Sequence, residues 1–122
     1  MTEEEAQIAK LIEFTNSILS NQYYLDGKIP KRGVTIEIYK DYEEHPEKKR
    51  IARTQIGDVV VSTVFLMIDH GFLDETPILF ETMIFGGEYN DFQERYETWE
   101  EAEEGHALAV KLVKEAINED FK

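Results

Sequence analysis

The segment from Val59 to Ile68 constrains the fold of this 122-residue chain more than any other. Its ten residues are almost all apolar and are rich in β-branched side chains. Such a run is typical of a strand that is buried on both faces. We therefore predict that Val59–Ile68 is the central strand of a sheet, with helices on one face and further protein, such as a second subunit, on the other.

Two capping boxes predict a helix near each end of the chain. Thr2 is followed three residues later by Glu5, and Thr98 is followed at the same spacing by Glu101. This pattern satisfies free amide groups at the start of a helix. Apolar residues recur with helical periodicity after each box. The predicted helices run from about Thr2 to Asn21 and from about Trp99 to Asn118.

Between these helices, the sequence predicts strands and turns. Val34–Tyr39 alternates apolar and polar residues, which is typical of a strand with one solvated face. The glycines and the proline of Asp26–Gly33 predict an irregular loop. The remaining strands are predicted at Arg50–Gln55, Ile78–Phe85 and Phe92–Tyr96. We expect residues 1–122 to form one α+β domain, with an antiparallel sheet flanked by an N-terminal and a C-terminal helix, and to be oligomeric.

Charge is distributed unevenly along the chain. The formal net charge is −13, yet eight of the thirteen basic residues lie between positions 28 and 53, against five acidic residues there. An acidic surface repels DNA, RNA and anionic membranes, whereas a local basic segment suits a small anion. The alternative is a solvated loop in which residues such as Lys48 and Lys49 keep an edge strand soluble.

The chain offers little catalytic equipment. It has no cysteine, no phosphate-binding loop and no nucleophile motif. Asp69, His70, Glu81 and His106 could in principle act as acids, bases or metal ligands, but their spacing matches no zinc or hydrolase signature. We therefore predict no catalytic residue, no metal and no cofactor. The acidic N-terminus and the short apolar run also predict neither a signal peptide nor a membrane span.

A denser group of residues follows Leu79. Phe80 could stack on a base, while Thr82 and Asn90 could donate or accept hydrogen bonds at its edge. Gly86 and Gly87 would let the backbone approach a ligand closely, with Tyr89 beside them. The alternative is that Phe80 and Phe85 are core residues and that Tyr89 is an ordinary surface aromatic. Composition alone leaves both interpretations open.

Three sequence blocks carry a family resemblance. They read VSTVFLMIDH (61–70), PILFETMIFGG (77–87) and YETWEEAEEGH (96–106). In this pattern the chain resembles a group of small phage and prophage proteins and is similar to the phage anti-Thoeris sponge proteins. The resemblance implies a compact α+β protomer in dimers or higher oligomers, acting in the cytoplasm of an infected bacterium. It also implies tight, non-catalytic binding of a glycocyclic ADP-ribose messenger, and in some members of cyclic oligonucleotides at separate sites.

The resemblance implies roles for two residues. Phe80 would stack on the adenine, and Asn90 would contact the ligand. Charge, rather than the motif, nominates Arg53 and Arg95 for the phosphates ahead of Lys28, because arginine binds phosphate with two parallel hydrogen bonds.

Two other functions stay open from the sequence. The acidic block Glu88–Glu104 could make the chain a decoy for a basic host protein. Asp69, His70 or Glu81 could instead make it a nucleotide-degrading enzyme.

Overall fold

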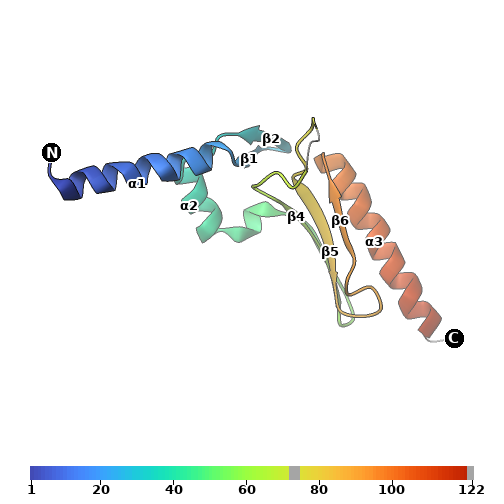
Figure 1. Cartoon of the computed structure of the whole chain (residues 1–122). Coiled ribbons are helices and arrows are strands. Elements are labelled where there is room, and N and C mark those ends of the chain that lie inside the picture. Colours follow the sequence, from blue (N-terminus) through green and yellow to red (C-terminus); the bar gives the residue numbers. More distant parts are fainter. Residues whose placement is uncertain (72–74, 121–122) are drawn as a thin grey trace.

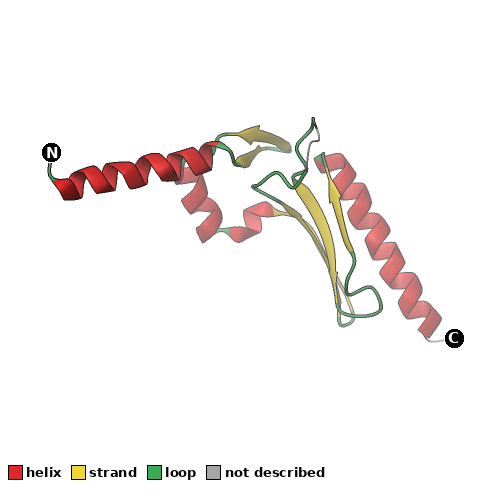
Figure 2. Ribbon diagram, viewed as in Figure 1, coloured by secondary structure: helices red, strands yellow, loops and turns green. Residues whose placement is uncertain are grey.

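Three α-helices and two antiparallel sheets make up the part of the chain that the computed structural model describes, residues 1–71 and 75–120 (Figures 1 and 2). The prediction of an α+β fold with helices at both ends is confirmed. In chain order the elements are α1 (Glu3–Ser20), β1 (Tyr23–Asp26), β2 (Ile29–Arg32), α2 (Ile36–Glu44), the 3-10 helix η1 (Pro46–Lys49), β3 (Arg50–Ile56), β4 (Val59–Phe65), β5 (Phe80–Phe85), β6 (Gln93–Tyr96) and α3 (Trp99–Asp120).

The larger sheet has the strand order β3-β4-β5-β6, and each neighbouring pair is antiparallel. The predicted central strand is confirmed as β4, an inner strand of this sheet. It ends at Phe65 rather than Ile68, because the chain then turns toward the N-terminal region, where the Met67 carbonyl accepts a hydrogen bond from the Tyr23 amide at 2.8 Å. Helix α3 contacts all four strands and covers one face of the sheet.

Two local predictions are wrong. The segment Asp26–Gly33 is not an irregular loop: most of it belongs to the β1–β2 hairpin, whose turn uses Gly27 at a φ of 64°. The segment Val34–Tyr39 is not a strand, because the Thr35 hydroxyl accepts a hydrogen bond from the Ile38 amide at 3.2 Å and caps α2. Tyr42, one helical turn after Ile38, is buried, and its hydroxyl accepts a bond from the Leu25 amide at 2.9 Å.

The threonine of each predicted capping box caps its helix. The Glu5 amide donates to the Thr2 hydroxyl at 3.1 Å, and the Glu101 amide donates to the Thr98 hydroxyl at the same distance. The caps explain why α1 and α3 start where the sequence indicated. None of the described helices is both long and apolar enough to cross a membrane.

The core lies between α3 and the four-stranded sheet and has two apolar clusters. The first contains Val59, Val61, Ile84, Ala109 and Val113. The second contains Phe65, Leu79, Phe80, Tyr96 and Ala102. Tyr23 and Leu25 of the hairpin pack against the second cluster, so the N-terminal elements share a core with the sheet.

Candidate functional site

The sheet face turned away from α3 gathers arginines from both edges of the sheet. Residues that pair across neighbouring strands project from the same face. One such row crosses the sheet as Arg50, Val64, Glu81 and Arg95. The next row is Arg53, Ser62, Met83 and Gln93, and the third is Gln55, Val60 and Phe85. We call this surface the arginine face.

The arginine face is locally basic in an acidic protein. Its charged residues are three arginines and Glu81, a carboxylate that is 8% exposed. The Arg95 Nε donates to Glu81 Oε2 at 2.8 Å, and the Gln93 amide donates to the same oxygen at 2.7 Å. This arrangement holds the Arg95 side chain through Nε, so its terminal nitrogens remain for another acceptor. Three strand spacings, roughly 14 Å, separate the two ends of the first row.

A cleft of about 590 Å³ adjoins the arginine face at Val64. It lies between the end of β4 and the α2–η1 region, and its polar lining includes Gln22, Lys49 and His70. The ring of Tyr39 forms part of its wall. The volume falls within the range typical of small-molecule pockets. Through Lys49 and His70, the cleft adds two nitrogen-bearing side chains beside the arginine face.

Phe80 does not face this surface. Its side chain is 0% exposed, its ring centroid lies 5.6 Å from that of Phe65, and the Trp99 ring meets it edge-on at 6.4 Å. Thr82, two residues along the same strand, is equally buried and shares a 2.6 Å hydrogen bond with the Thr63 hydroxyl. Neither side chain is therefore exposed on this surface, where stacking on a base by Phe80 or reading of its edge by Thr82 would require it. The alternation of β5 turns both side chains toward α3.

Three further predicted residues lie apart from the two arginines. Asn90 closes the β5–β6 connection, because its Oδ1 accepts a bond from the Gly86 amide at 2.6 Å. Tyr89 is half-buried and packs against the Val59 cluster on the α3 side. Lys28, in the hairpin turn, lies 5.8 Å from the centre of the Trp99 ring and 3.8 Å from the Glu103 carboxylate. Of the predicted residues, Arg53 and Arg95 share a surface.

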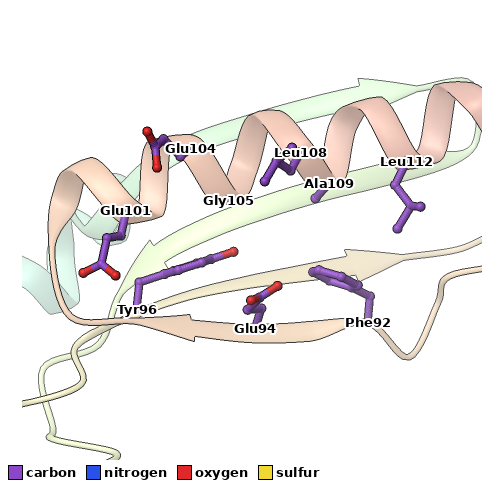
Figure 3. A pocket seen from close by; sticks show the side chains of 9 residues that line it. All are labelled: Phe92, Glu94, Tyr96, Glu101, Glu104, Gly105, Leu108, Ala109 and Leu112. Atoms are coloured by element: carbon purple, nitrogen blue, oxygen red, sulfur yellow. The ribbon is translucent and has the colours of Figure 1, made fainter.

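On the other side of the sheet, α3 and β6 enclose an acidic groove of about 380 Å³ (Figure 3). Glu94, Glu101 and Glu104 provide its carboxylates. The rest of its lining is largely apolar and consists of Phe92, Tyr96, Gly105, Leu108, Ala109 and Leu112. Three carboxylates repel an anionic ligand, so this groove and the arginine face suit opposite kinds of partner.

The four acid–base candidates have separate surroundings. Asp69 stabilises its own loop, because its Oδ1 accepts hydrogen bonds from the Gly71 and Ile78 amides at 2.7 and 2.8 Å. Glu81 is paired with Arg95, and His70 lines the cleft. His106 is buried between hydroxyls, and burial lowers its pKa. Within residues 1–71 and 75–120, the structure places no group of three or more histidine or carboxylate side chains where they could hold a metal.

Comparison with protein-family models, with curated proteins and with solved structures gives no match for this chain. The candidate site is therefore argued from the residues and geometry of this chain alone. Sequence reasoning missed Arg50 and Phe85 as members of the face and Tyr39 as part of the cleft wall. The pairing of β3 with β4 brings Arg50 opposite Val64, and a bulge after Arg50 hides this relation from simple alternation.

Proposed function

We propose that this protein binds an anionic cyclic nucleotide of the cyclic ADP-ribose type on its arginine face and holds it without cleaving it. The observation that carries the proposal is the convergence of Arg50, Arg53 and Arg95 on one sheet face of a chain with a net charge of −13. The resemblance to anti-Thoeris sponges supports the choice of ligand. In that setting the protein would be a phage anti-defence protein in the cytoplasm of the infected bacterium, without a cofactor.

The chemistry of the face suits a pyrophosphate. Arginine forms paired hydrogen bonds with phosphate oxygens, and its charge is retained at any physiological pH. Glu81 keeps the Arg95 side chain extended across the sheet through the 2.8 Å bond, which reduces the entropy lost when a ligand binds. Arg53 is exposed on β3, one row along and at the opposite edge of the sheet, so its backbone lies roughly 14 Å or more from that of Arg95. We expect these two long side chains to reach a ligand that lies across the face from its two edges.

An aromatic surface for the base is available without Phe80. Phe85 is 49% exposed and ends β5 on the arginine face. Stacking of a base on such a ring contributes about 1 to 3 kcal/mol. A messenger held at submicromolar to nanomolar concentration requires about −8 to −12 kcal/mol in total. We propose that a homo-oligomer supplies part of this by bringing a second copy toward the face.

Sequestration can be separated from catalysis in one experiment. The protein is incubated with glycocyclic ADP-ribose, freed of unbound ligand, and heated to unfold it. The unbound fraction and the supernatant are then both analysed by mass spectrometry. Intact nucleotide in stoichiometric amount in the supernatant supports the proposal, and altered nucleotide in either fraction supports the degrading enzyme instead. Intact nucleotide found wholly in the unbound fraction contradicts both.

The acidic groove supports a second candidate function. Its three carboxylates and apolar floor would suit a basic protein with an apolar anchor, as expected for a decoy of a host factor. Such binding would weaken steeply between low and high salt. Loss of binding on changing Glu101 and Glu104 to Gln, with the nucleotide titration unchanged, would assign the groove to that partner.

A further inference from the structure

Glu81 is an acidic residue in the middle of a surface that otherwise attracts anions. It lies on β5, between Val64 of β4 and Arg95 of β6, and is 8% exposed. A carboxylate is costly to bury, and here its charge also opposes the binding of phosphate. The ion pair with Arg95 accounts for one of its two oxygens. The other oxygen needs a separate explanation.

The two carboxylate oxygens of Glu81 have different surroundings. Oε2 accepts a hydrogen bond from Arg95 Nε at 2.8 Å and one from the Gln93 amide at 2.7 Å, which occupies both of its lone pairs. Within residues 1–71 and 75–120, no group donates to Oε1. The one fully buried side-chain polar atom without a partner in these ranges is the Tyr96 hydroxyl, so Oε1 is in contact with solvent. Glu81 therefore presents one acceptor oxygen to the arginine face.

This oxygen restricts the kind of group that a ligand can place against it. An ionised carboxylate only accepts hydrogen bonds, so the ligand must present an O–H or N–H donor there. The same ligand places a phosphate at the terminal nitrogens of Arg95, whose backbone lies one strand spacing, roughly 5 Å, from that of Glu81. The donor and the phosphate must therefore be close together in the ligand.

A ribose hydroxyl meets this requirement better than the amine of a base. In a ribonucleotide the sugar is joined directly to the phosphate, whereas the base lies beyond the sugar. The base is also proposed to stack on Phe85, which lies four residues along β5 from Glu81, roughly 14 Å away. A base on that ring leaves a sugar, rather than the base itself, for the position beside Glu81 and Arg95.

The neighbours of Glu81 also suit a sugar. Val64, its partner on β4, and Met83, two residues along β5, are both half-buried on the arginine face. Apolar side chains beside a single acceptor can pack against the carbon atoms of a sugar ring while one hydroxyl reaches the carboxylate. The cleft of about 590 Å³ begins at Val64 and leaves space beside this position.

We propose that Glu81 selects ribonucleotides by accepting a hydrogen bond from a ribose hydroxyl at Oε1, while Oε2 holds Arg95 against the adjacent phosphate. This role rests on the proposed nucleotide site and adds its specificity for the sugar. A ligand without that hydroxyl loses a bond to a charged group and still has to desolvate the carboxylate. The negative charge of Glu81 thus lowers the affinity for phosphate in general and raises the selectivity for a hydroxylated sugar.

Titration calorimetry with glycocyclic ADP-ribose and its single-deoxy analogues, each lacking one free ribose hydroxyl, tests this role. In the unchanged protein, we expect one analogue to bind roughly ten-fold more weakly than the parent nucleotide, or worse. Glu81→Gln keeps an oxygen for Gln93 and Arg95 but replaces the charged acceptor with an amide. We expect this variant to lose most of the discrimination between the two ligands, which a double-mutant cycle measures.

Glu100→Gln is the matched control, because it removes the same charge from an exposed position on α3, the helix that covers the opposite face. It should discriminate between the ligands like the unchanged protein. A purely structural Glu81 would change the affinity for parent and analogue by the same factor. That result, or equal binding of all analogues to the unchanged protein, would show that Glu81 reads no hydroxyl, although the nucleotide site would stand. No binding of the parent nucleotide to the unchanged protein would overturn both the site and this role.

Discussion

His106 links α3 to two strands through a buried chain of hydroxyl groups. Its Nε2 lies 2.8 Å from the Thr54 hydroxyl, and its Nδ1 lies 2.7 Å from the Thr63 hydroxyl, which is itself bonded to Thr82. A neutral imidazole donates through one nitrogen and accepts through the other, so it can satisfy both threonines. The buried site has no carboxylate among these bonded neighbours. Burial therefore favours the neutral ring and lowers the pKa of His106.

This burial predicts that folding stability decreases in mild acid. Below the unfolded-state pKa of about 6.5, the unfolded chain binds a proton that folded His106 does not, so the free energy of unfolding falls as the pH is lowered. Urea denaturation at pH 7.5 and pH 5.5 measures this change, above the range where most carboxylates titrate. We expect His106→Gln to reduce the pH dependence, while His45→Gln, at an exposed position, retains it. Equal pH dependence in all three proteins would contradict the assignment.

Phe80 and Phe85 should separate core packing from ligand binding. Phe80→Ala should cost about 3 to 5 kcal/mol of folding stability, because it opens a cavity beside Phe65 and Trp99. Phe85→Ala should change thermal stability little but weaken a stacked nucleotide by about 1 to 3 kcal/mol. Thermal melting and ligand titration of both variants give the comparison. A stable Phe80→Ala protein with selectively lost binding would restore Phe80 to the pocket.

At the scale of elements, the contact between α3 and β6 depends on a glycine. A Cβ atom added at Gly105 would collide with the ring and hydroxyl of Tyr96, so a glycine lets the helix approach the strand. Burial raises the pKa of the Tyr96 phenol, and its hydroxyl has no hydrogen-bond partner among the described residues. The close packing of α3 on β6 at Gly105 therefore leaves the buried Tyr96 hydroxyl without a hydrogen bond among the described residues.

Gly105→Ala should consequently destabilise the protein despite the better helix propensity of alanine. Propensity alone would favour alanine by about 1 kcal/mol, whereas forcing a methyl group into a packed contact costs about 1 to 3 kcal/mol. Ser17→Ala, at an exposed helix position, serves as a control that lacks the collision. A higher melting temperature for Gly105→Ala would show that Tyr96 moves away without cost.

The elements differ in how well the sequence predicts them. Capping boxes and long periodic stripes identified α1 and α3, because those signals are local. Six residues of alternation at Val34–Tyr39 could not distinguish a strand from a capped helix, and the outcome depended on Tyr42 reaching the distant Leu25 amide. In β5, apolar residues occupy both faces, so the sequence did not reveal whether Phe80 or Phe85 faces α3. The pairing of the four strands, which depends on tertiary structure, placed Arg50 on the same face of the sheet as Arg53 and Arg95.

At the scale of the whole molecule, charge separates two surfaces of one sheet. The arginine face carries Arg50, Arg53 and Arg95, whereas the groove on the α3 side carries Glu94, Glu101 and Glu104. The acidic surroundings repel long polyanions and anionic lipid, while a small anion can still reach the arginines. This distribution favours a nucleotide ligand over DNA, RNA or a membrane.

Isothermal titration with glycocyclic ADP-ribose at constant ionic strength tests the central claim most directly. Arg53→Ala should weaken binding by about 1.5 to 3 kcal/mol without changing the melting temperature, because Arg53 is exposed and loses a charge-assisted contact. Arg95→Ala should weaken binding as much and also lower stability, since it removes the ion-pair partner of the buried Glu81 carboxylate. Lys28→Ala, the control beside Trp99, should bind like the unchanged protein. Unchanged affinity in both arginine variants, or no binding to the unchanged protein, would contradict a nucleotide site on the arginine face.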